Sequence, residues 1–88
     1  MLYDNRITGR VIFELRMKKG LTQEVLSGLA CIPRSHLAMI ESGRISPTVD
    51  TLWKIAEALG MHLSDLIRLV EDETGAVAIA VVSALTNR

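Results

Sequence analysis

Apolar residues recur every three or four positions along most of this chain, in short segments separated by glycine, proline or small polar residues. This spacing matches the 3.6-residue turn of an α-helix, and no long stretch before residue 76 alternates apolar and polar residues as a half-buried strand does. Only 3% of the residues are aromatic, which argues against a β-sandwich. The pattern therefore predicts an all-α fold.

Start and stop signals divide this pattern into five helices. Gly20 ends the first helix, and Thr22 is a good N-cap for the second. Pro33 fixes the backbone at the start of the third, and either Ser46 or Thr48 caps the fourth. The expected helices span residues 7–19, 22–29, 33–41, about 48–59, and 62–70.

The inward faces of these helices predict one small core, because 88 residues leave no room for a second core of useful size. By helical spacing, the residues expected in the core are Leu26, Ile32, Leu37, Ile40, Leu52, Ile55 and Leu59, with Val25, Leu29, Leu63, Leu66 and Ile67 completing the apolar faces of the second and fifth helices. Trp53 is expected to be half-buried or part of a surface patch.

The last residues form a separate feature. The acidic run at 71–75 is expected to end the fifth helix, so that residues 1–72 form the main domain and residues 73–88 an apolar C-terminal segment. Residues 76–85 are apolar nearly all round, and their spacing leaves both helix and strand open, with four alanines favouring helix. Either this segment folds back on its own domain, or it forms a two-fold dimer seam. The residues expected at that seam are Val77, Ile79, Val81 and Leu85; Val11 and Phe13 offer a second partner surface.

The formal net charge is zero but unevenly distributed: residues 1–54 carry +3 and the remainder −3. A positive N-terminal half is compatible with a polyanionic partner. The single cysteine rules out an intramolecular disulfide and fits a reducing compartment. Because the longest apolar run is far below the roughly 20 residues needed to cross a bilayer, and no signal peptide is evident, we expect a cytoplasmic protein without a membrane span.

Enzymatic and metal chemistry find no support in the sequence. A zinc site built from Cys31, His36 and His62 would lack a fourth ligand and the usual spacing. Nucleophile, base and orienting residue do not occur together, and there is no glycine-rich phosphate loop. We therefore expect neither an enzyme nor a cofactor.

Residues 22–41, TQEVLSGLACIPRSHLAMIE, have the spacing of two short helices joined by a tight turn, as in a helix-turn-helix. The flanks extend this pattern, with Arg16 before it, IESGR at 40–44, Pro47, and IAEALG up to Gly60. In this combination, residues 7–70 resemble the Xre family, the phage-repressor and Cro type of DNA-binding domain. A five-helix fold of that type is what the resemblance implies.

The resemblance also implies a set of DNA contacts. The third helix would lie in the major groove, with Arg34, Ser35 and Met39 at positions where the family places base-contacting side chains. His36 is as well placed for a phosphate as for a base. The residues expected at phosphates are Thr22, Gln23, Ser42, Gly43 and Arg44.

Two further residues have structural interpretations. Arg16 matches a family position that pairs with a glutamate, and Glu41 is available for that pair; direct contact of Arg16 with DNA is the alternative. Cys31 occupies the turn where relatives usually carry a glycine with positive φ, which costs on the order of 1 kcal/mol for a cysteine. We expect its thiol to be tucked into the turn, with redox sensing as the alternative.

Taken together, the sequence predicts a transcriptional regulator, most simply a repressor, that binds double-stranded DNA at an inverted repeat as a homodimer. The competing hypothesis is a protein-interaction module, or an antitoxin-like subunit, that keeps the fold and binds DNA weakly or together with another protein.

Overall fold

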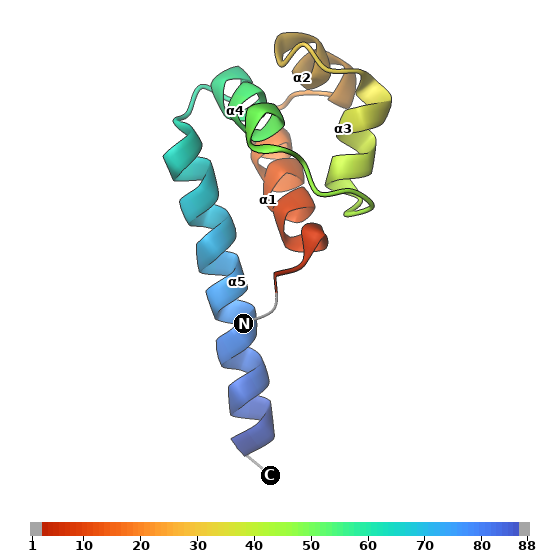
Figure 1. Ribbon diagram of the computed structural model, residues 1–88. Helices are drawn as coiled ribbons and strands as arrows, with labels where there is room; N and C mark the ends of the chain where they lie inside the picture. Colours follow the sequence, from red (N-terminus) through yellow and green to blue (C-terminus); the bar gives the residue numbers. More distant parts are fainter. Residues whose placement is uncertain (1–2, 87–88) are drawn as a thin grey trace.

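Five helices make up the computed structural model, which describes residues 3–86 but not the side chains of residues 76–82 and 86 (Figure 1). They are α1 (Asn5–Lys18), α2 (Gln23–Leu29), α3 (Arg34–Glu41), α4 (Val49–Ala58) and α5 (Leu63–Thr86). Residues 3–86 contain no strand. The predicted all-α class and the number of helices are therefore confirmed.

Side-chain caps fix the starts of three helices. Asp4 accepts a hydrogen bond from the backbone N–H of Arg6 at the start of α1, which begins two residues earlier than predicted. Thr22 caps α2, as predicted. Thr48, and not Ser46, caps α4. Each cap satisfies a backbone donor that has no partner within its helix.

The core lies where the four shorter helices meet the first half of α5. Its fully buried large side chains are Ile12, Leu26, Leu37, Ile40, Ile55, Leu59 and Leu66. Of the residues predicted for the core, Ile32 and Leu63 are only partly buried but pack against it. Val11, predicted as part of a partner surface, is instead buried in the core, whereas Phe13 is exposed.

Three apolar residues predicted to face inward are exposed. Val25 and Leu29 of α2 are 47% and 59% exposed, and Ile67 of α5 is 42% exposed. In α2 the buried stripe runs instead through Leu26 to Ala30, about 100° round the helix from Val25 and Leu29. A helix of seven residues buries only one narrow face, so apolar residues on its neighbouring face stay in solvent.

The predicted helix end at residues 71–75 is wrong, because α5 continues through the acidic run to Thr86. The acidic side chains of residues 71–73 stay exposed in solvent, so they do not break the helix. The hydroxyl of buried Thr74 donates to the carbonyl of Val70 at 2.8 Å, which satisfies it within the helix. Residues 76–86 are helical and not a strand. The side chains of Val77, Ile79 and Val81 lie outside what the structure describes, and the side chain of Leu85 is 60% exposed.

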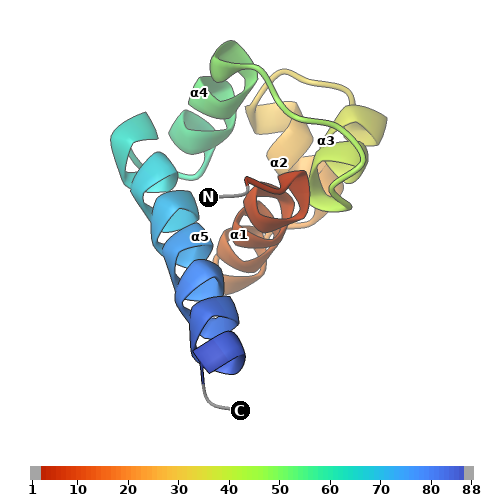
Figure 2. The same cartoon turned by 60° about the horizontal axis from the view of Figure 1, so that its bottom comes forward.

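α1 occupies the centre of the molecule, with α3 on one side and α5 on the other, and α2 and α4 lie at the end where α1 finishes (Figure 1). The second half of α5 projects beyond the other helices, as the view in Figure 2 also shows. Gly9 allows α1 to approach α3 closely, because a Cβ there would collide with the backbone carbonyls of Ile40 and Glu41. That contact sets the position of α3 on the body.

Candidate nucleic-acid interface

The outer face of α3 presents polar and apolar side chains while its inner face is anchored in the core. Leu37 and Ile40 are fully buried. Arg34, Ser35 and Met39 are exposed on the opposite side. His36, the fourth residue predicted to reach DNA, is only partly exposed. The three residues predicted to contact bases therefore share an exposed face on a firmly held helix.

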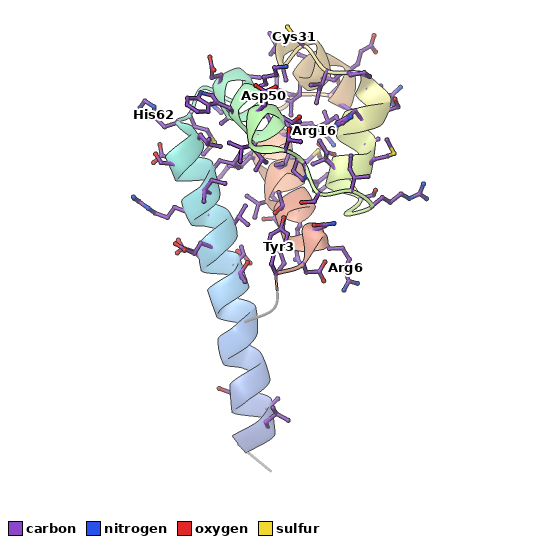
Figure 3. All side chains as sticks on the ribbon, viewed as in Figure 1. Tyr3, Arg6, Arg16, Cys31, Asp50 and His62 are labelled. Carbon is purple, nitrogen blue, oxygen red and sulfur yellow. The ribbon has the colours of Figure 1, made fainter. Side chains whose placement is uncertain are left out.

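A buried ion pair connects α1 to the end of α3. Arg16 Nε donates to Glu41 Oε2 at 2.7 Å, and Arg16 Nη2 donates to Oε1 at 3.0 Å. The two side chains are 9% and 5% exposed, and Arg16 Nη1 also donates to the backbone carbonyl of Leu21 at 2.8 Å. The structure thus contains the predicted pair, and Arg16 points into the protein (Figure 3).

Gln23 joins this network, a contact that the sequence did not predict. Its Nε2 donates to Glu41 Oε1 at 3.0 Å, so the start of α2 is tied to the end of α3. A side-chain amide nitrogen carries two N–H groups, and this bond uses one of them. The other N–H can therefore still donate to a phosphate. Thr22, the neighbouring cap, accepts from the backbone of Val25 and keeps its own hydroxyl hydrogen.

The loop after α3 carries the second group of predicted phosphate contacts. Ser42 donates its hydroxyl to the backbone carbonyl of Met39 at 3.1 Å. Gly43 has φ +78°, in the left-handed region that favours glycine. Arg44 follows with its side chain exposed. The left-handed residue turns the chain away from α3 and presents Arg44 to solvent at the end of the predicted reading helix.

Arg6 packs against this loop and was missed from the sequence. A Cβ on Gly43 would collide with Arg6 Cγ, so the start of α1 lies directly against the loop. The side-chain hydrogen bond to Arg6 lowers the pKa of the partly exposed Asp4 carboxyl, and the same bond raises the pKa of Arg6. No local signal reveals this contact, because 36 residues separate Arg6 from Gly43.

The turn between α2 and α3 is left-handed at Cys31, which has φ 56°. The backbone N–H of Ile32 donates to the carbonyl of Ser27 at 3.0 Å and closes the turn. Contrary to the prediction, Cys31 is exposed and not tucked into the turn (Figure 3). Among the side chains that the structure describes, no three histidine, cysteine or acidic residues lie close enough to hold a metal ion.

The helix-turn-helix family HTH_3 matches residues 12–66, well over half of the chain. The chain belongs to this family of Xre/Cro-type DNA-binding domains. It is 37% identical over 62 residues to an uncharacterised HTH-type transcriptional regulator, y4dJ of Sinorhizobium fredii, covering 70% of this chain and 80% of that protein. It is also 39% identical over 59 residues to the immunity repressor protein of Bacillus phage phi105, but covers only 41% of it against 67% of this chain.

Solved structures agree with this assignment. The restriction-modification controller protein C.AhdI from Aeromonas hydrophila is 32% identical with a TM-score of 0.68, covering 70% of this chain and 94% of that one. The regulator ClgR of Corynebacterium glutamicum matches with a TM-score of 0.81 over 91% of this chain and 85% of its own; at 21% identity, it supports the fold alone. The protein is accordingly a DNA-binding transcriptional regulator of HTH type, from a family of regulators and not of enzymes. Within residues 3–86, no helix has the length and apolar character to span a membrane.

Proposed function

We propose that this protein is a repressor that binds an inverted-repeat operator as a homodimer, with α3 of each subunit in the major groove. The observation that carries the proposal is the arrangement of α3. Its inner residues Leu37 and Ile40 are fully buried, its outer residues are exposed, and groups that can donate to phosphates lie beside its C-terminal end. A helix about 10 to 12 Å across fits the roughly 12 Å wide major groove.

The outer side chains of α3 supply the chemistry for reading bases. Arg34 can donate two parallel hydrogen bonds to guanine O6 and N7, the commonest specific contact to a base. Ser35 can donate or accept, and Met39 offers an apolar surface to a thymine methyl group. His36, which is less exposed, reaches either a base edge or a phosphate.

Two groups of residues near the C-terminal end of α3 would bind phosphates and set the register of the helix in the groove. Gln23 and Thr22 lie at the start of α2, where Gln23 bonds to Glu41, and Ser42, Gly43 and Arg44 follow Glu41 in the loop after α3. Phosphate contacts of this kind carry no sequence information of their own. The buried network of Arg16, Glu41 and Gln23 fixes the distance between the two groups, because it ties α2 to the end of α3.

Repression and dimerisation are inferred from relatives and from the apolar C-terminal segment. The phage phi105 relative is named an immunity repressor. Two subunits related by a two-fold axis match an inverted repeat whose half-sites are about 34 to 36 Å apart. The uncharged residues 76–85 supply an apolar segment that a monomer would leave in water. Residues 1–72 then act as the DNA-binding domain and residues 73–88 as the dimerisation element.

The test compares how substitutions of Arg34 and Arg44 change binding to operator DNA and to random DNA. The operator is selected from the DNA upstream of the protein's own gene, with random DNA as competitor. Arg34→Ala should reduce the preference for the operator by about 1 to 3 kcal/mol, because it removes a base contact. Arg44→Ala should weaken binding to operator and random DNA alike. Arg68→Ala, which removes an equal charge from α5 on the far side of α1 from α3, is the control and should change neither.

The rival function predicts a different result. In a protein-interaction module or an antitoxin-like subunit, Arg34→Ala and Arg44→Ala would have equal and small effects on DNA binding. A selection that returns no preferred sequence from upstream DNA would also reject the repressor.

A further inference from the structure

The loop after α3 has already committed most of its own hydrogen-bond donors. The backbone N–H groups of Ser42, Gly43 and Arg44 donate to carbonyls in the last turn of α3, at 3.0 to 3.1 Å. The hydroxyl of Ser42 donates to one of these carbonyls as well, at 3.1 Å. Among the donors of residues 42–44, the exposed side chain of Arg44 is therefore the one that can bind a phosphate without first giving up a bond.

Arg6, in the first turn of α1, lies directly against this loop. A Cβ on Gly43 would lie 2.8 Å from Arg6 Cα and 3.0 Å from its backbone nitrogen. The Arg6 side chain is 78% exposed. Figure 3 shows Arg6 at the start of α1, on the side that carries α3 and away from α5. Two arginines from different parts of the chain, Arg6 and Arg44, therefore adjoin Gly43.

The guanidinium of Arg6 already binds an anionic group. Its Nε donates to the two carboxylate oxygens of Asp4 at 3.1 and 3.2 Å, and its Nη2 donates to one of them at 2.7 Å. The backbone N–H of Arg6 donates to the same carboxylate at 2.8 Å. Carboxylates and phosphates accept the same forked pair of N–H groups from arginine. Asp4 therefore occupies a place that suits a phosphate.

The side-chain pair of Asp4 and Arg6 is one that a phosphate can replace. The two side chains are 38% and 78% exposed, and an exposed ion pair contributes little to stability. Asp4 also caps α1 through its bond from the backbone N–H of Arg6, and that bond does not involve the guanidinium. The guanidinium can therefore leave Asp4 while the start of α1 keeps its cap.

We propose that Arg6 is a further phosphate-binding residue, whose guanidinium leaves Asp4 and binds the DNA backbone together with Arg44. Asp4 then competes with DNA for Arg6. This inference rests on the DNA binding of the proposed function, to which it adds a contact from α1. Arg6 lies outside residues 12–66, which match the family, so the family resemblance does not supply this contact.

The position of Arg6 favours a phosphate over a base. Arg6 belongs to α1 and lies beside the loop after α3, whereas base edges are reached from the outer face of a reading helix. Groups beside such a helix meet the backbone that borders the groove. Because phosphates carry no sequence information, Arg6 should strengthen binding to operator and random DNA alike.

Arg6→Met in the full-length protein tests the contact. Methionine removes the charge but keeps the carbon atoms that pack against Gly43. Losing one phosphate contact in each subunit of a dimer should make the slope of log K against log salt concentration less steep by about 1.8. The loss of affinity should therefore be about tenfold larger at about 50 mM than at about 200 mM salt. Fluorescence anisotropy on operator and random DNA measures these constants.

Arg10→Met is the matched control. The Arg10 side chain is 76% exposed and its Nε bonds to Glu14 at 3.1 Å, so it is also an exposed arginine of α1 with a carboxylate partner. It lies one turn, about 6 Å, farther along α1. Arg10→Met reports the general attraction between a cation on α1 and DNA, and it should change the slope much less than Arg6→Met.

Arg6→Lys separates charge from packing. Lysine keeps the positive charge beside the loop, so the slope should stay close to that of the unmodified protein. A slope as shallow as that of Arg6→Met would mean that the substitutions act by displacing the loop, which would overturn the phosphate contact. Circular dichroism should show the same helical content in all of these variants.

Asp4→Asn tests the competition. Asparagine caps a helix about as well as aspartate, but it leaves the charge of Arg6 unpaired. The variant should bind DNA more tightly, by up to about fivefold per subunit. In the Arg6→Met background the same substitution should gain less, because no guanidinium is released. Glu14→Gln, which releases Arg10, is the control and should also gain less.

The outcomes separate this contact from the proposed function. A slope that is shallower for Arg6→Met than for Arg10→Met supports the contact. Equal slopes for these two variants overturn it, while an unmodified protein that still prefers the operator leaves the proposed function intact. A gain from Asp4→Asn that persists in full without Arg6 overturns the competition, because Asp4 would then act on DNA by repulsion alone. An unmodified protein that does not bind DNA overturns the proposed function as well.

Discussion

Gly43 shows how one residue shapes the predicted phosphate-binding loop. Its φ of +78° costs an alanine about 1 to 2 kcal/mol, and a Cβ would collide with Arg6 Cγ and lie 2.8 Å from Arg6 Cα. Gly43→Ala should therefore destabilise the fold by more than the backbone cost alone. Urea denaturation followed by circular dichroism measures the change.

Gly20→Ala is the matched control for that prediction. Gly20 has φ +69°, but a Cβ there would meet nothing within 4 Å, so it bears the backbone cost alone. Equal losses for the two variants would mean that Arg6 moves aside freely. In that case Arg6 would not hold the loop after α3.

The buried pair of Arg16 and Glu41 gives a second prediction at this scale. Glu41→Gln keeps the size of the side chain but leaves the Arg16 guanidinium, which is 9% exposed, without its counter-charge. Breaking a buried pair by removing one partner costs about 3 to 5 kcal/mol, so the free energy of unfolding should fall by about that amount.

The control removes the same charge from an exposed pair. Glu14 bonds to Arg10 one turn away, with both side chains largely in solvent. Glu14→Gln should change stability by less than about 1 kcal/mol in the same urea titration. If Glu41→Gln cost no more than Glu14→Gln, the pair of Arg16 and Glu41 would not be what anchors α3.

The sequence predicted the buried ion pair at the end of α3 but missed the neighbouring contacts of Gln23 and Arg6. Arg16 and Glu41 were paired through the family resemblance, and the structure contains that pair. The bond from Gln23 to Glu41 was missed, because nothing in the sequence tells which of the surrounding polar groups completes a buried carboxylate. Arg6 was missed because its contact with Gly43 depends on how α1 packs, which local patterns do not encode.

Among the elements, the contact between α1 and α3 controls where the predicted reading helix lies. Gly9→Ala would press a Cβ against the carbonyl oxygens of Ile40 and Glu41, and these backbone atoms move only if the two helices separate. Overpacking costs typically about 1 to 3 kcal/mol, which outweighs the gain of up to 1 kcal/mol from alanine in a helix. Thermal unfolding should show a lower Tm, and operator affinity should fall because α3 shifts.

Gly28→Ala isolates the helix-propensity part of this prediction. A Cβ at Gly28 would meet nothing within 4 Å, so alanine there should stabilise α2 by about 0.5 to 1 kcal/mol. If Gly9→Ala also raised the Tm, α1 and α3 would be less closely packed than the structure has them.

Helices and most of their ends were easier to predict than the faces that they bury. Caps and left-handed glycines mark helix ends locally, which is why α1 to α4 lie within two residues of their expected bounds. Which apolar stripe is buried depends on the neighbouring helices, so Val25, Leu29 and Ile67 were wrongly placed inside. The end of α5 was also misjudged, since an acidic run followed by glycine resembles a stop signal but remains compatible with an exposed helix.

Positive and negative charges are unevenly distributed between the two parts of the chain. The N-terminal 54 residues carry +3 and the remainder −3. Exposed arginines lie on α3 and in the loop after it, and the exposed acidic residues 71–73 lie on α5, across α1 from α3 (Figure 1). A polyanion is therefore drawn to the side that carries α3 and repelled from the side that carries α5.

This arrangement predicts a definite salt dependence. If a dimer neutralises about four to six phosphates, the slope of log K against log salt concentration should be roughly −4 to −5, since each phosphate contributes about −0.9. Leu85→Glu, if monomeric, should bind a single half-site with about half that slope, because it keeps one set of Gln23, Ser42 and Arg44. Fluorescence anisotropy from low to physiological salt, on the operator and on a half-site, measures both slopes. A slope near zero for the unmodified protein would contradict phosphate binding and favour the interaction module.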